Sequence, residues 1–161
     1  MRNESNTLSV APAIGQLSEC LEDYIEIVYN LIQEQRVARI RDIARAKRVK
    51  MSSAVSALKR LARAGLVKYE AREFVELTRA GARLASGLTR RHRFLTRFLV
   101  DVLQVNPRIA ESEACSMEHT LSPQTMERFY RFSQFLETKS PGTKTVMERF
   151  RRSYLKPKRG K

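Results

Sequence analysis

The chain has 161 residues, and 31 Lys and Arg against 17 Asp and Glu give it a formal charge of +14. This length suits one or two small domains rather than a large enzyme, and this charge favours a polyanionic partner, either nucleic acid or an anionic membrane surface. No apolar run is long enough to span a bilayer, residues 1–15 lack the apolar stretch of a secretory signal, and two cysteines make no disulfide framework. We therefore expect a cytoplasmic protein without a membrane partner.

The N-terminal half predicts a flexible arm, three helices and a β-hairpin. Residues 1–16 have no hydrophobic period. Apolar residues at helical spacing define the helices, with Ser52 or Ser53 as the cap of the third, and alternating apolar and polar residues define the strands. The predicted helices and strands are Ser18–Gln33, Arg39–Ala46, Ser52–Ala64, Leu66–Glu70 and Phe74–Leu77.

The C-terminal half predicts three helices separated by short polar breaks. Thr78, Asn106-Pro107 and Ser122-Pro123 mark their starts. The predicted helices are Arg79–Gln104, Arg108–Leu121 and a third that ends at Glu137, before the break at Ser140-Pro141-Gly142. The expected fold class is mainly α. The expected parts are a flexible arm, a winged helix-turn-helix domain, a helical metal-binding and dimerisation domain and a basic tail, over 1–16, 17–78, 79–138 and 139–161.

The predicted order of helix, helix, turn, helix and hairpin is typical of a winged helix-turn-helix, whose second motif helix enters the DNA major groove. Ten basic residues and one acid lie between Arg36 and Gly65. We expect this face to bind double-stranded DNA through phosphates and base edges, although a solvated basic surface on an ordinary helical domain is the alternative. The candidate DNA-binding residues are Arg39, Lys50, Ser52, Ser53, Ser56, Lys59, Arg60 and, at the hairpin tip, Arg72.

Three potential metal ligands share one face of the predicted helix over 108–121. Cys115, Glu118 and His119 stand at positions i, i+3 and i+4, which are neighbours on a helix surface. Thiolate, carboxylate and imidazole all bind first-row transition metals. A Glu-His neighbour pair is also common on solvated helices, and a lone cysteine is more often a small buried side chain.

Further candidate ligands lie on two other predicted helices. His92 stands among arginines, so we expect a neutral imidazole with a ring nitrogen available to a metal. Asp23 and Glu26 are three residues apart on the first helix and form an acidic pair. An exposed acidic helix face is the alternative explanation of that pair.

Three stretches resemble the diphtheria-toxin-repressor and manganese-transport-regulator family of metal-dependent bacterial repressors. They read LEDYIEIVY over 21–29, RHRFLTRFL over 91–99 and EACSMEHTLS over 113–122. The resemblance extends over about residues 18–138. It implies an N-terminal winged helix-turn-helix, a helical dimerisation domain, a homodimer on a palindromic operator and regulation, mostly repression, of metal-homeostasis genes.

The resemblance also implies a metal centre with up to two divalent ions per subunit. Cys115 matches the iron-type members, whereas the acidic pair and the lack of a third, SH3-like domain match the manganese type. Because a thiolate disfavours Mn²⁺ relative to Fe²⁺, we expect Fe²⁺ as the effector and Mn²⁺ as a working substitute. Glu111 and Thr96 replace a His and a Glu of the iron type's ancillary site. By motif position, the implied ligands are Asp23, Glu26, His92, Cys115, Glu118 and His119.

The expected switch is electrostatic. Without metal, the carboxylates of Asp23, Glu26 and Glu118 are expected to repel one another and to leave the first helix loosely held. Metal would neutralise them and set the spacing of two recognition helices in the dimer. The residues expected in or near the dimer contact are Phe94, Phe98, Met126, Phe129 and Phe132.

Three rival functions follow from the same residues. Oxidation of Cys115 could control DNA binding in place of a metal. A structural chromatin-type protein would bind DNA without metal or sequence preference. A zinc metallohydrolase would leave the basic face without a role, and the chain has neither a His-Glu-x-x-His motif nor a Gly-rich phosphate loop. We therefore expect no enzyme activity and no small-molecule substrate.

Overall fold

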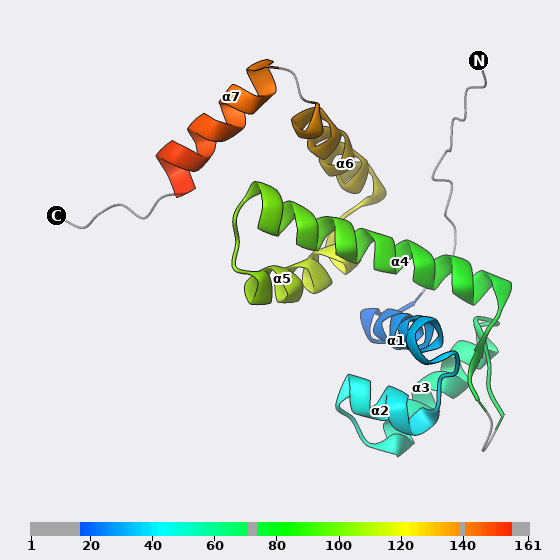
Figure 1. Cartoon of the computed structure of the whole chain (residues 1–161). Helices are drawn as coiled ribbons and strands as arrows, with labels where there is room; N and C mark the ends of the chain where they lie inside the picture. The colour runs from blue at the N-terminus through cyan, green and yellow to red at the C-terminus, as the bar shows by residue number, and fades with distance from the viewer. Residues whose placement is uncertain (1–16, 71–73, 139–140, 156–161) are drawn as a thin grey trace, which may run out of the picture. The chain divides into compact units, whose positions relative to one another are not determined.

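The computed structural model describes residues 17–70, 74–138 and 141–155. They are mainly α-helical, as predicted (Figure 1). Two compact units divide between Thr89 and Arg90, inside helix α4 (Arg79–Arg97), whereas the expected domain boundary follows residue 78. Among these residues, no helix is both long and apolar enough to cross a membrane. The N-terminal arm and the candidate Arg72 lie outside the described residues.

The first unit has the order of a winged helix-turn-helix, which confirms the predicted fold. The hairpin pairs Val67 with Leu77, and an isolated bridge joins Val75 to Ala38 instead of to the first strand. The paired strands are therefore shorter than predicted. The elements of this unit that precede α4 are α1 (Glu19–Gln35), α2 (Ile40–Lys47), α3 (Met51–Arg63), β1 (Val67–Lys68) and β2 (Glu76–Leu77).

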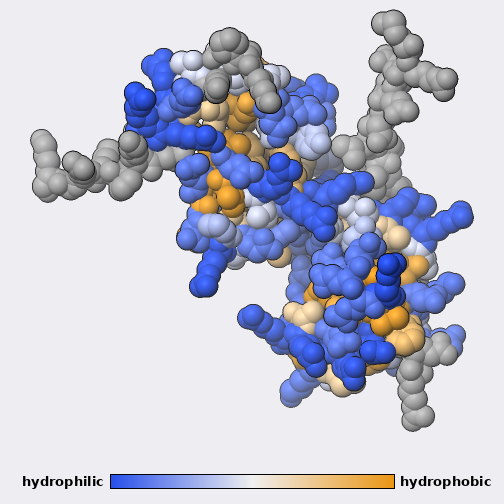
Figure 2. All heavy atoms as spheres, viewed as in Figure 1, coloured by the Kyte–Doolittle hydropathy of each residue, from blue (hydrophilic) through white to orange (hydrophobic). Residues whose placement is uncertain are grey.

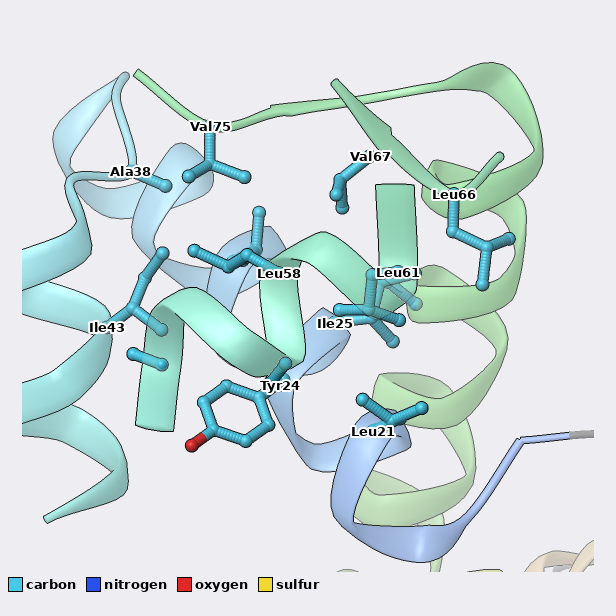
Figure 3. Close-up of a cluster of buried hydrophobic side chains, with 14 of the residues drawn as sticks. Leu21, Tyr24, Ile25, Ala38, Ile43, Leu58, Leu61, Leu66, Val67 and Val75 are labelled. Carbon is cyan, nitrogen blue, oxygen red and sulfur yellow. The ribbon is translucent and has the colours of Figure 1, made fainter. Parts of the chain in front are cut away.

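One apolar core joins every element of the first unit. Figure 3 shows side chains from α1, α3 and the hairpin meeting in it, and Ile25, Leu58 and Leu61 have no exposed surface. Burying a side chain of this size contributes about 1.5–3 kcal/mol, so α1 and α3 are held firmly together. Leu84 and Leu88 from the beginning of α4 belong to the same core, which explains why the unit extends beyond residue 78.

The start of α3 differs from the prediction. Lys50 is its N-cap residue, and the backbone amides of Ser53 and Ala54 donate hydrogen bonds to the Lys50 carbonyl oxygen. The helix begins one residue before the predicted caps, so Ser52 and Ser53 lie in its first turn with exposed side chains. At the other end, Gly65 has φ of +70°, as expected for a glycine just after a helix.

Helix α4 starts against the hairpin and ends earlier than predicted. The Thr78 hydroxyl accepts a hydrogen bond from the Gly81 amide at 3.1 Å, and a Cβ on Gly81 would lie 1.9 Å from the backbone oxygen of Leu66. The α-helix ends at Arg97 and continues as a π-helical turn, η1 (Phe98–Val102), instead of reaching Gln104 as α-helix. Gln104 has φ of +58° and turns the chain towards α5.

The second unit contains the predicted helices and further helical structure near the C-terminus. Asn106 and Ser122 cap α5 and α6 as expected, because their side chains accept hydrogen bonds from the amides of Arg108 and Thr125. The expected basic tail includes α7, where apolar residues recur at helical spacing. The bounds are α5 (Pro107–Thr120), α6 (Pro123–Glu137), α7 (Pro141–Phe150) and η2 (Arg151–Leu155). The buried core residues are Leu95, Leu99, Ala110, Ala114 and Met126.

Candidate metal centre and DNA-binding surface

His92 lies between two carboxylates of α5. Its Nδ1 is 3.1 Å from Oε2 of Glu118, and its Nε2 is 2.9 Å from Oε1 of Glu111. The hydrogen bond to Glu118 is the largest cause that raises the pKa of His92 to about 9, against the opposing effect of burial. The expectation of a neutral imidazole was therefore wrong. The neighbouring arginines matter less than the two carboxylates that contact the ring.

Glu118 is the most buried polar side chain of this group, with 1% of its surface exposed. Its Oε1 lies 3.3 Å from Nε2 of His119 without hydrogen-bond geometry, and it accepts no hydrogen bond from the residues that the structure describes. A buried carboxylate oxygen without a donor is costly. His92 contacts the other oxygen, Oε2, so two imidazoles flank one buried carboxylate from either oxygen. Imidazole and carboxylate are both good ligands of divalent transition ions.

Cys115 stands one helical turn before His119 on α5, and its thiol is exposed and in no disulfide. Glu111, Cys115 and Glu118 stand at positions i, i+4 and i+7, so they share the helix face on which His92 is bound. The second unit by itself therefore brings His92 and Glu118 into contact, with His119 beside Glu118 and Cys115 on the adjoining turn.

Asp23 and Glu26 lie on α1 in the first unit, and both side chains are partly buried. Oδ2 of Asp23 forms an ion pair with Nζ of Lys47, the last residue of α2. Asp23 is thus paired with an ammonium group, and Glu118 is paired with the imidazolium of His92. Two of the three carboxylates expected to repel one another therefore lie beside a basic side chain.

The candidate DNA-binding side chains of α3 form its exposed face, opposite the buried Ala54, Leu58 and Leu61. Arg39 is exposed as well, and its guanidinium lies 5.2 Å from the ring centre of Phe74 in a cation–π contact that orients it. Hydrophilic side chains cover most of the visible surface in Figure 2, with apolar patches between them. The exposed candidates on and before α3 are Lys50, Ser52, Ser53, Ser56, Lys59 and Arg60.

Three residues with a place in these sites escaped the sequence analysis. Glu111 was named only as the replacement of a His in the iron type's ancillary site, although its spacing from Cys115 and Glu118 already placed it on their face. Phe74 beside Arg39 and Lys47 beside Asp23 pair with residues far away in the chain. No local pattern reveals those two, because tertiary packing brings the partners together.

Comparisons with known proteins give one answer over most of the chain. Residues 16–75 match the family model described as "Iron dependent repressor, N-terminal DNA binding domain", and residues 78–146 match "Iron dependent repressor, metal binding and dimerisation domain". The transcriptional regulator MntR of Escherichia coli O6:H1 is 38% identical over 116 residues, which are 72% of this chain and 74% of that protein. An HTH-type transcriptional regulator of Methanocaldococcus jannaschii is 32% identical over 124 residues, 76% of this chain and 99% of that one.

Among solved structures, a manganese-dependent transcriptional repressor in complex with manganese matches with a TM-score of 0.64 and 32% identity. The match covers 71% of this chain and 53% of that chain, so this chain spans about half the length of the solved structure. These relatives are transcription regulators and not enzymes. The chain therefore belongs to the diphtheria-toxin-repressor and manganese-transport-regulator family of metal-dependent transcriptional regulators, as its three motifs predicted.

Proposed function

We propose that the protein represses genes of metal homeostasis, and that divalent iron or manganese raises its affinity for a palindromic operator. It acts as a homodimer in the cytoplasm. The observation that carries the proposal is the convergence of His92 and His119 on the buried carboxylate of Glu118, in the unit that matches a metal-binding and dimerisation domain. The proposed ligands, for one or two ions, are Asp23, Glu26, His92, Cys115, Glu118 and His119.

The metal would supply positive charge to acidic ligands, and the chain's own packing supplies the link to DNA. α1 carries Asp23 and Glu26 on its polar side, and it buries Ile25 against Leu58 and Leu61 of the recognition helix α3. A constraint on α1 therefore acts on α3 through a shared core. A metal that binds the DNA-competent state about 100-fold better would shift the equilibrium by about 2.7 kcal/mol.

The test is selection of DNA by the full-length protein from a pool of random duplexes. Parallel selections would contain Mn²⁺, anaerobic Fe²⁺ or EDTA. We expect a palindromic sequence to be enriched with either metal and not with EDTA, because the two recognition helices of a symmetric dimer read two half-sites. Equal enrichment of one sequence in EDTA would contradict metal control, and retention of DNA without any enriched sequence would indicate a general DNA-coating protein.

The choice of metal is proposed to depend on the Cys115 thiolate. If its sulfur binds the metal, the site favours Fe²⁺ over Mn²⁺, because a soft thiolate ligand binds Fe²⁺ more strongly than Mn²⁺. The variant Cys115→Glu should then shift activation towards Mn²⁺. The measurement is the ratio of the activation midpoints for the two metals, taken anaerobically by DNA binding in wild type and variant. An unchanged ratio would show that the sulfur does not select the metal.

A further inference from the structure

We propose that the ammonium group of Lys47 is a built-in competitor of the metal for Asp23 and thereby sets the metal concentration at which the protein responds. This inference rests on the proposed function, in which Asp23 is a metal ligand. It adds a residue outside the ligand set and outside the DNA-binding candidates. Nζ of Lys47 forms an ion pair with Oδ2 of Asp23, and a metal bound to that carboxylate would displace it.

The ion pair belongs to the packed part of the first unit. Asp23 lies on α1 and Lys47 ends α2, and their side chains are 23% and 27% exposed. Beneath them Tyr24 and Ile43 are buried in the unit's core, which fixes the two helices relative to each other. The pair is therefore less screened by water than a fully exposed ion pair, and it does not rely on two mobile surface chains meeting.

The chemistry of exchange follows from the charges. A divalent ion and an ammonium group repel each other, and both seek the carboxylate oxygens of Asp23. When a metal takes Asp23, the Lys47 side chain moves into solvent, which its long flexible stem allows. Metal binding then includes the cost of breaking an existing ion pair, so the chain responds at a higher metal concentration than its ligands alone would dictate.

The test is a Mn²⁺ titration of the full-length protein without DNA, with free Mn²⁺ measured by its electron paramagnetic resonance signal. Lys47→Met removes the charge and keeps an apolar stem, Lys47→Arg keeps the charge, and Arg45→Met removes a charge from an exposed position of the same helix. We expect Lys47→Met to bind Mn²⁺ about fivefold more tightly than wild type. Lys47→Arg and Arg45→Met should remain within about twofold of wild type.

A second readout is the melting temperature of the EDTA-treated protein, which should be lower in Lys47→Met than in wild type because Asp23 loses its ion pair with Lys47. The increase in melting temperature on adding Mn²⁺ should be larger in Lys47→Met than in wild type. Unchanged or weaker Mn²⁺ binding in Lys47→Met would overturn the proposal and leave the proposed function standing. Equal tightening in Arg45→Met would also overturn it, since the effect would then be general charge. If wild type binds no Mn²⁺, the metal site itself is wrong and this inference fails with it.

Discussion

At the residue scale, the protonation of His92 is decided by its contacts and not by its sequence neighbours. Arginines flank it in the chain, but the carboxylates of Glu118 and Glu111 lie 3.1 and 2.9 Å from its ring nitrogens. The hydrogen bond to Glu118, and after it the hydrogen bond to Glu111, raises the pKa of His92 to about 9, against the opposing effect of burial. A metal ligated by this ring would replace a proton that these acids already favour.

The raised pKa of His92 makes the stability of the metal-free protein depend on pH. Because the pKa rises from 6.5 to about 9 on folding, its stabilising effect is complete below about pH 6.5 and is lost as the pH rises through 9. Chemical unfolding in EDTA should show wild type losing stability relative to His92→Gln between about pH 6 and 9.5, on the order of 1–3 kcal/mol. Parallel pH profiles of the two proteins would contradict the charged state.

Single residues also show how far sequence reasoning reaches. Cys115, Glu118 and His119 could be placed on one helix face because helical spacing is a local rule. The charge on His92 and the pairing of Asp23 with Lys47 could not be predicted, because both depend on partners at least 19 residues away. Local sequence patterns identify candidate ligands, whereas tertiary contacts determine which basic side chains lie beside them.

At the element scale, the same contrast applies to helices. The starts of α5 and α6 were predicted because Asn106 and Ser122 accept hydrogen bonds from amides two or three residues ahead. The early end of α4 was missed, since the π-helical turn over 98–102 has no local sequence signal of its own. α7 was included in a tail because its segment was interpreted as basic, although Val146, Met147 and Phe150 recur at helical spacing.

The glycines of α4 give a matched test of its packing. A Cβ at Gly81 would lie 1.9 Å from a backbone oxygen of Leu66, whereas a Cβ at Gly87 would meet nothing within 4 Å. Gly81→Ala should destabilise the protein by about 1–3 kcal/mol or more, because backbone must shift. Gly87→Ala should stabilise it by up to about 1 kcal/mol through helix propensity. Equal effects of the two substitutions in thermal unfolding would contradict the described contact between Gly81 of α4 and Leu66, which lies between α3 and β1.

At the scale of the whole molecule, the second unit leaves aromatic side chains for a partner. Phe98 and Met126, expected in or near the dimer contact, are buried within the chain itself, whereas Phe132 is 50% exposed and Phe135 is 59% exposed. Exposed apolar side chains of this size are typical of an interface. We therefore predict that α6 supplies the centre of the dimer contact.

Sedimentation at micromolar concentration tests this surface. Wild type should be a dimer, and Phe132→Glu combined with Phe135→Glu should be a folded monomer, because charges would enter an apolar contact. Val49→Glu changes an exposed apolar residue of the first unit and should remain dimeric. A monomeric wild type in the presence of metal and operator would rule out the dimer.

Metal bound by the proposed ligand set is expected to control DNA binding. The direct measurement is fluorescence anisotropy of the selected duplex, titrated with protein in Mn²⁺ or anaerobic Fe²⁺ and again after EDTA. Wild type should bind about 100-fold more tightly with metal than with EDTA, and His119→Ala, folded and dimeric, should show no such gain. Equal affinity of wild type with and without metal would contradict metal control of DNA binding, and full metal activation of His119→Ala would contradict the proposed ligand set.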